Sequence, residues 1–85
     1  MASYVIAGPA GDAQLAECEY LGHQLDLSSE ASVRVVVKHP QEWPSFLRGV
    51  CASFGFKRKS TPIVFTVDGA LIGGLEDFRT HVLAK

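Results

Sequence analysis

The sequence predicts a single α/β domain with the element order βαβαββα. Runs of apolar and β-branched residues alternate with amphipathic stretches of helical period, which is typical of strands separated by helices. In the last third, a strand after Pro62 leads into an Asp68-Gly69 turn, a second strand and a Gly73-Gly74 break before a helix. Because 85 residues can bury one sheet covered by helices and little else, residues 1–85 are expected to form one domain.

The first half of the chain supplies two strands and a helix. A strand is expected at residues 3–7 and a helix at residues 12–26, where Asp12 can cap the first turn. The polar residues 27–32 end this helix, because serine and aspartate side chains compete for backbone hydrogen bonds. Residues 32–38 are rich in β-branched valine, with charges that flank an apolar centre, and this pattern predicts a strand in the interior of the sheet.

A second helix is predicted at residues 41–54. Pro44 falls in its first turn, where backbone N–H groups lack helical partners, and Gly55 follows as the C-cap. The apolar residues of this helix recur at helical spacing and form a stripe that is expected to face the core. The stripe consists of Trp43, Phe46, Leu47, Val50, Cys51 and Phe54.

The hairpin and the last helix complete the order. Asp68-Gly69 is expected to form a two-residue turn between the last two strands, because it can take positive φ. Gly73-Gly74 then gives a bend before a helix that begins near Leu75. One side of this helix is apolar and holds Leu75, Phe78 and Val82.

The C-terminal half of the chain resembles that of glutaredoxins, which carry Thr-Val-Pro, a strand, a short turn, a strand, Gly-Gly and two acidic residues. The matching residues are Thr61-Pro62 and the run from Gly73 to Asp77. The resemblance implies a thioredoxin fold: a four-stranded mixed sheet with helices on both faces, the first and third on one and the second on the other. It also implies a cis bond before Pro62 and exposed backbone at Thr61 that pairs with an extended thiol peptide. Taken alone, Pro62 is also compatible with a trans bond that opens a buried strand.

A narrower resemblance covers nearly the whole chain and is to the glutaredoxin-like N-terminal extension of malate-dehydrogenase-like proteins of ciliated organisms. A dehydrogenase domain is not expected here, because 85 residues cannot hold a Rossmann fold and the sequence lacks Gly-x-Gly-x-x-Gly. The chain is therefore expected to be an excised module or a short free-standing relative. The resemblance rests on residues 5–8, 60–63 and 71–74 and on the spacing of Glu42-Trp43, Leu47 and Val50-Cys51.

The catalytic motif of glutaredoxins is missing from this sequence. Those proteins place Cys-Pro-x-Cys between the first strand and the first helix, where the helix N-terminus lowers the pKa of the thiol. At the corresponding turn this chain has Asp12 in the position of the nucleophile and Leu15 in the resolving position. A carboxylate cannot attack a disulfide, so Asp12 is expected to cap the helix. The alternative is an anion site on residues 8–11, but no lysine of a phosphate loop follows and Asp12 would repel an anion.

The cysteines and histidines predict neither a catalytic residue nor a metal site. Cys18 and Cys51 lie on the inner sides of helices that cover opposite faces in the implied fold, so a disulfide between them is not expected. His23, His39 and His81 have no metal spacing and lie beside no candidate nucleophile. A glutathione-dependent thiol oxidoreductase that uses Cys18 is the rival interpretation.

The resemblance implies one candidate ligand site, at the end of the sheet where the loops before the first helix, the cis proline and the last helix meet. Lys57 and Lys59 either belong to a solvated loop or meet the glycyl carboxylate of glutathione, as basic residues do in the family. The candidate ligand-binding residues are Gly11, Asp12, Lys57, Lys59, Thr61, Pro62, Gly73, Gly74, Leu75 and Glu76.

The predicted function is that of a redox-inactive glutaredoxin-like module for binding or structure, with an unidentified protein or peptide as partner. The alternative is that the module binds glutathione, and no other cofactor is expected. Gly74 and Glu76-Asp77 favour it, whereas Pro9 disfavours it because many relatives have a basic residue there.

Composition and hydropathy exclude two classes of partner. A net charge of −1 does not supply the basic face of a nucleic-acid binder. No apolar run of membrane-spanning length and no signal peptide occurs, so no membrane partner is expected. A soluble cytoplasmic protein is therefore predicted, and the resemblance adds the cilium as a further compartment. The chain is expected to be a monomer.

Overall fold

The computed structural model describes residues 2–27, 31–56 and 61–83, and the elements follow one another in the predicted order. Helix and strand bounds agree with the expected ones to within two residues. The predicted linker lies partly outside the described residues. The elements are β1 (Ala2–Pro9), α1 (Ala13–Leu27), β2 (Ala31–Lys38), α2 (Trp43–Phe54), β3 (Ile63–Thr66), β4 (Leu71–Gly73) and α3 (Leu75–Leu83).

The strands form a four-stranded mixed sheet in the order β2-β1-β3-β4. β1 runs parallel to β2 and antiparallel to β3, and β4 completes the hairpin with β3. The expectation that residues 32–38 lie inside the sheet is wrong, because β2 is at an edge. Its apolar centre is partly open, with 39% of Val35 and 51% of Val37 exposed. The interior positions belong instead to β1 and β3, which carry the fully buried Ile6 and Ile63.

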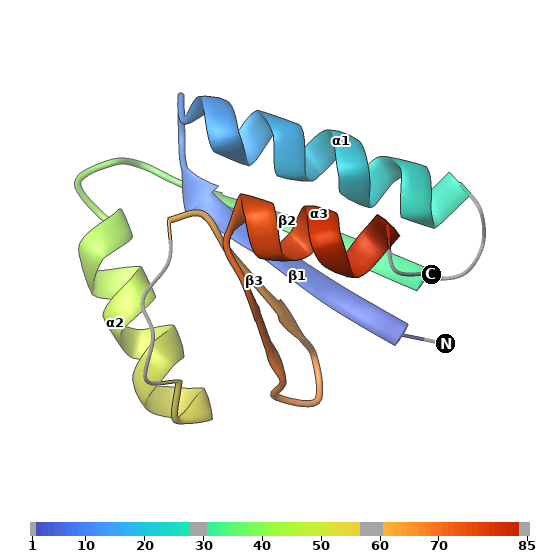
Figure 1. Cartoon of the computed structure of the whole chain (residues 1–85). Helices are drawn as coiled ribbons and strands as arrows, with labels where there is room; N and C mark the ends of the chain where they lie inside the picture. Colours follow the sequence, from blue (N-terminus) through green and yellow to red (C-terminus); the bar gives the residue numbers. More distant parts are fainter. Residues whose placement is uncertain (1, 28–30, 57–60, 84–85) are drawn as a thin grey trace.

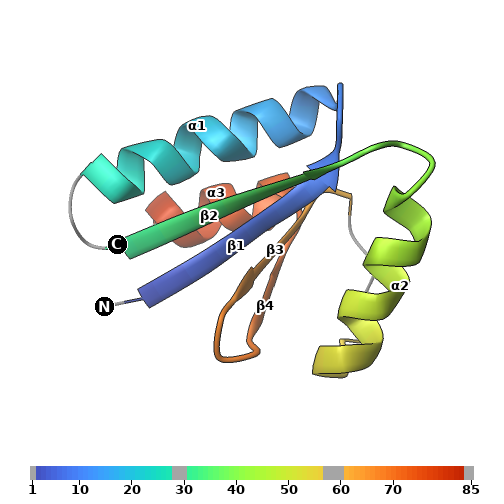
Figure 2. The same cartoon turned by 180° about the vertical axis from the view of Figure 1, so that it is seen from behind.

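The helices cover both faces of the sheet, as the fold class requires. α1 and α3 lie side by side on one face, whereas α2 lies on the other (Figures 1 and 2). Neighbouring residues of a strand point to opposite faces, so Ile6 belongs to the core under α1 and α3 while Ala7 belongs to the core under α2. Leu15, Cys18 and Phe78 pack in the first core; Trp43, Leu47 and Cys51 pack in the second.

Gly22 lets α1 approach the sheet closely. A Cβ atom at this position would lie 2.8 Å from Cδ1 of Ile6 and 2.9 Å from Cγ1 of Val33, which is shorter than van der Waals contact allows. A larger residue here would push α1 away from β1 and β2. The close approach therefore depends on the missing side chain.

α2 begins two residues later than expected. The carbonyl of His39 accepts hydrogen bonds from the N–H groups of Glu42 and Trp43, so a tight turn occupies the residues before the helix. Gly55 takes a left-handed conformation at the C-cap, as predicted. Phe54, the last residue of the predicted stripe, is only partly buried. It is 40% exposed, and its ring centroid lies 5.4 Å from that of Phe56 and 5.2 Å from that of the buried Phe65.

The hairpin connection is longer than the predicted two-residue turn. Val67, Asp68 and Gly69 form a three-residue loop, closed by a hydrogen bond from the Thr66 N–H to the Ala70 carbonyl at 2.8 Å. The φ of Gly69 is 102°, the left-handed value that such a loop needs at its third position. The Thr66 hydroxyl accepts from the Ala70 N–H at 2.9 Å and donates to the Asp68 carboxylate, so a threonine side chain stabilises the longer loop.

Candidate functional site

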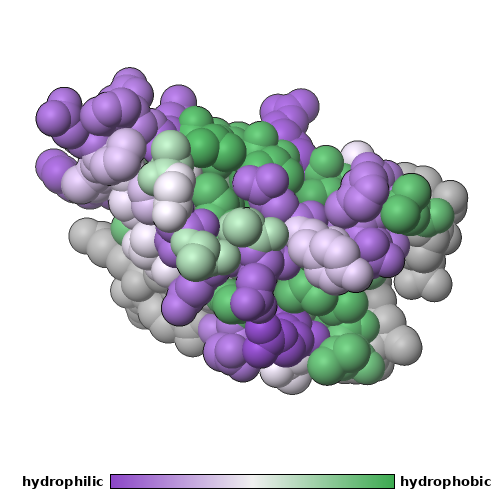
Figure 3. All heavy atoms as spheres, turned by 90° about the horizontal axis from the view of Figure 1, so that it is seen from above, coloured by the Kyte–Doolittle hydropathy of each residue, from purple (hydrophilic) through white to green (hydrophobic). Residues whose placement is uncertain are grey.

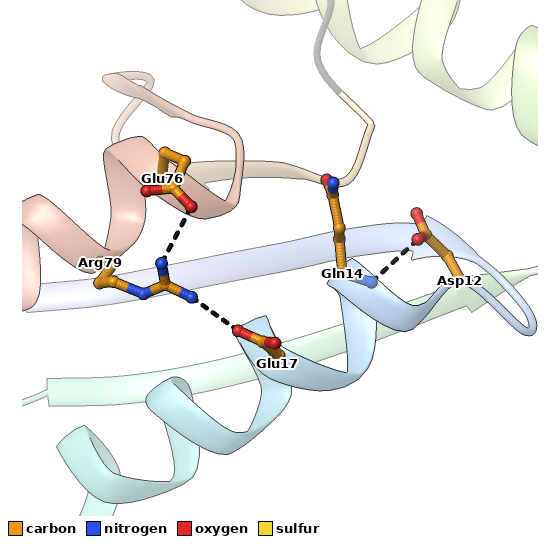
Figure 4. Close-up of polar contacts among 5 residues, drawn as sticks. All are labelled: Asp12, Gln14, Glu17, Glu76 and Arg79. Carbon is orange, nitrogen blue, oxygen red and sulfur yellow. Dashed lines mark hydrogen bonds and ion pairs between the residues drawn. The ribbon is translucent and has the colours of Figure 1, made fainter.

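Asp12 caps α1, as the sequence predicts. Its carboxylate oxygen accepts a hydrogen bond from the N–H of Gln14 at 3.0 Å (Figure 4), and its carbonyl accepts one from the N–H of Ala16 at 3.2 Å. The Gln14 N–H belongs to the first turn, whose N–H groups have no backbone partner within the helix, whereas the Ala16 N–H makes the first hydrogen bond of the helix itself. The group at the start of α1 is therefore a carboxylate engaged in backbone hydrogen bonding.

Strand register brings the loops of the candidate site to one end of the sheet. Ala7 in β1 lies opposite Ile63 in β3, and Val64 lies opposite Gly73 in β4. The backbone that continues past these pairs must therefore leave the sheet at a common end. It comprises residues 8–12, 61–62 and 73–75.

The Thr61–Pro62 peptide bond is cis in the structure, and its two residues differ in exposure. Pro62 is buried beneath the end of the sheet, whereas Thr61 is exposed. The indole N–H of Trp43 donates a hydrogen bond to the Thr61 hydroxyl at 3.1 Å. Trp43 was expected to be a core residue, and it is only 6% exposed. Its second role at Thr61 could not be inferred from helical spacing, which carries no information about the far end of the side chain.

The start of α3 is held by its own carboxylates and by an arginine that sequence analysis did not single out. Asp77 accepts a hydrogen bond from the Gly74 N–H at 3.3 Å. The Arg79 guanidinium reaches Glu76 at 2.9 Å and Glu17 of α1 at 2.6 Å, and it thereby joins the two helices that share a face (Figure 4). The Gly74 N–H and the Glu76 carboxylate, both candidate ligand contacts, thus already have partners within the chain.

The other candidate residues fall into three groups. Gly11 is exposed and lies next to the cap residue of α1. Gly73 and Leu75 are buried, so the Leu75 side chain packs in the core with α1 and β3 and does not line an open surface. Lys57 and Lys59 lie outside the described residues.

The two cysteines are buried thiols in separate cores. Burial raises the pKa of the Cys18 thiol from 9.0 to about 11. The charges of Asp12 and Glu17 act in the same direction, against a smaller opposing effect of Arg79. A thiol with such a pKa carries almost no thiolate near neutral pH, and the thiolate is the nucleophilic form.

The histidines do not assemble a metal site. Among the residues that the structure describes, no three His, Cys, Asp or Glu side chains are grouped to hold an ion. His81 instead forms a hydrogen bond through Nε2 to the Tyr4 hydroxyl at 2.8 Å, and His39 accepts one from the Gln41 N–H at 3.1 Å.

None of the described helices has both the length and the apolar content needed to cross a bilayer.

Comparison with known proteins agrees with this architecture. The family model described as "Putative malate dehydrogenase 1B N-terminal domain" matches residues 3–84. Two relatives named "Putative malate dehydrogenase 1B" are 38% identical, from Branchiostoma floridae, and 27% identical, from Homo sapiens. Each alignment includes 95% of this chain and only 17% of the relative, so the chain spans a small part of these proteins.

One solved structure supports the fold directly. The structure of reduced Escherichia coli glutaredoxin superposes with a TM-score of 0.75, covering 98% of this chain and 95% of that chain. Sequence identity between the two is 21%, so the likeness concerns the fold.

Proposed function

We propose that this chain, which belongs to the family of malate dehydrogenase 1B N-terminal domains, is a redox-inactive glutaredoxin-like module that binds an extended peptide. The observation that carries the proposal is the Asp12 cap at the start of α1. In a glutaredoxin-like frame this is the position of the attacking thiol, and here it holds a carboxylate bonded to the Gln14 N–H. A carboxylate at this position contributes helix stability and no disulfide chemistry.

The remaining thiols do not offer a substitute nucleophile. Cys18 is fully buried on the inner face of α1, and its raised pKa keeps it protonated near neutral pH. Cys51 lies on the inner face of α2 and packs in the other core. Neither sulfur is placed to attack a disulfide at the end of the sheet, and this supports the absence of reductase activity.

The peptide-binding part of the proposal rests on Thr61. This residue is exposed next to the buried Pro62, and the hydrogen bond from Trp43 restrains its side chain. A restrained, exposed residue just before β3 can pair its backbone with an extended chain in the manner of strand addition. Binding of this kind needs no thiol in the module.

Glutathione is the less favoured ligand of this surface. The Gly74 N–H and the Glu76 carboxylate have partners within α3, and Asp12 adds negative charge nearby. An anionic tripeptide would have to displace these contacts or approach a carboxylate.

We also propose that the module is a cytoplasmic monomer and that an unidentified protein is the source of the peptide.

Two assays test the proposal. In the first, reduction of a mixed glutathione disulfide is measured with the wild type, and no turnover above the uncatalysed rate is expected. Turnover that disappears in Cys18→Ser would contradict redox inactivity.

In the second assay, octapeptides selected on the protein from a random library are titrated into ¹⁵N-labelled protein, with reduced glutathione in parallel. Amide shifts are expected at residues 11–12, 61 and 73–75 with peptide and not with glutathione. Saturable shifts of those residues on addition of glutathione would contradict the proposal and would identify glutathione as the ligand of this surface.

A further inference from the structure

The edge strand β2 presents a second surface, away from the end of the sheet that holds Thr61. Within the described part of the chain, β2 pairs with β1 from Ala31 to Lys38 and has no strand on its other side. A strand of eight residues at an edge offers a row of backbone donors and acceptors to an added strand.

A hollow of about 440 Å³ runs beside this edge, between α1 and β2. Its apolar walls come from Tyr20 of α1, which is 64% exposed, and from Val33 and Val35 of β2. Val37 continues the same face of β2 and is 51% exposed. Seen from the side of α1, the molecule shows hydrophobic surface between hydrophilic side chains (Figure 3). Apolar side chains on an added strand would cover these residues.

The charged groups that line the hollow are acidic. Glu19 and Asp26 project from α1 and are exposed, with His23 between them, and none of the described lining residues is a lysine or arginine. The carboxylates are seven residues apart on one helix, or about 10 Å along its axis. Arg34 and Lys38 alternate with the valines along β2 and therefore belong to the other face of the sheet.

We propose that β2 and this hollow bind an extended polypeptide segment that carries valine-like and lysine or arginine side chains toward α1 and neutral polar side chains on its other face. Basic residues four positions apart in a strand are about 13 Å apart, which matches the spacing of the two carboxylates within the reach of a lysine. Neutral residues on the other face avoid Arg34 and Lys38. A second copy paired through β2 fits less well, because it would bring Glu19 and Asp26 of both chains to one seam.

The test uses two synthetic peptides and the full 85-residue chain. The probe is acetyl-Val-Thr-Lys-Thr-Val-Thr-Lys-Thr-Val-amide, and the control peptide has glutamate in place of both lysines. Titration at pH 7 and low salt, followed by amide shifts, is expected to move residues 31–38 and the exposed face of α1 with the lysine peptide only. The Glu19→Lys/Asp26→Lys double variant should weaken that binding about tenfold or more and favour the glutamate peptide.

Glu42→Lys is the matched control, because Glu42 is an exposed carboxylate that makes no side-chain cap and lies outside the hollow. It should leave the affinity for the lysine peptide within about twofold. The proposal is overturned if the peptide does not bind, if the double variant binds it as the wild type does, or if the shifts fall at residues 61 and 73–75. Concentration-dependent shifts of residues 31–38 without peptide would also overturn it, since they would show that a second copy occupies the edge.

Discussion

The indole N–H of Trp43 in α2 donates a hydrogen bond to the hydroxyl of Thr61, 3.1 Å away and just before β3. The contact connects the helix on one face of the sheet to the exposed residue at the end of the sheet. Trp43 fills the core under α2 with its ring while its single polar atom restrains Thr61. The proposed peptide surface is thus tied to the packing of α2.

Removing this hydrogen bond should lower stability modestly. Trp43→Phe keeps an aromatic ring and removes the donor, and Thr61→Val removes the acceptor. A double-mutant cycle from urea unfolding should give a coupling free energy of about 0.5–1.5 kcal/mol. Zero coupling means that the double variant loses as much stability as the two single variants together. That result would show that Trp43 acts through packing alone.

The cap at α1 predicts a second effect on stability. Asp12→Ala removes the acceptor of the Gln14 N–H and should lower the free energy of unfolding by about 0.5–2 kcal/mol. Asp12→Asn is the matched control, because an amide oxygen can accept the same hydrogen bond without the charge. If Asn is as destabilising as Ala, charge rather than hydrogen bonding accounts for the effect.

The sequence predicts the fold well because apolar periodicity and turn residues are local signals. Spacing within a few residues predicts the apolar faces of α2 and α3, the order of elements along the chain and the Gly55 cap. The position of β2 at the edge of the sheet could not be predicted from its sequence. A run of valines fits an interior strand just as well as an edge strand that lies beside a helix. The Thr66 hydroxyl bonds to Asp68 and Ala70 across the three-residue hairpin loop, and an Asp-Gly signal does not report these contacts.

The candidate site was predictable only where its chemistry is local. Asp12 as a cap follows from its place at the head of a helix, and the structure confirms it. The ion pair of Arg79 with Glu17 joins residues 62 positions apart in the chain, so no pattern of sequence spacing indicates it. Ligand binding by the candidate residues stays a prediction.

The link between α1 and α3 should contribute little to stability and depend on salt. Arg79 is 39% exposed, and its partners Glu17 and Glu76 are 60% and 80% exposed, so water screens both pairs. Arg79→Gln should therefore lower the free energy of unfolding by less than about 1 kcal/mol at low salt. In 1 M NaCl the difference from the wild type should shrink further. A larger loss that persists in salt would indicate packing by the arginine stem.

The raised pKa of Cys18 predicts a loss of stability in alkali. The folded chain keeps the thiol proton up to about 11, whereas the unfolded chain releases it near 9.0. The unfolded state then binds fewer protons, so the free energy of unfolding falls as pH rises from 9.0 toward 11. Cys18→Ala lacks this group, and its stability should fall less steeply over the same interval. Parallel pH profiles of the two proteins would contradict the raised pKa.

The substitution Asp12→Cys tests whether the start of α1 is a vacated thiol site. A thiol introduced at the head of α1 meets the helix dipole and the N–H of Gln14, both of which favour the thiolate. Its pKa should fall below about 8.5, so alkylation by iodoacetamide should be half-maximal below that pH. Cys18 and Cys51 are internal controls, because they are buried and should react slowly in the folded chain. An introduced thiol with an unshifted pKa would show that the turn after β1 does not present Asp12 to the helix N-terminus, and the correspondence with the glutaredoxin nucleophile would fail.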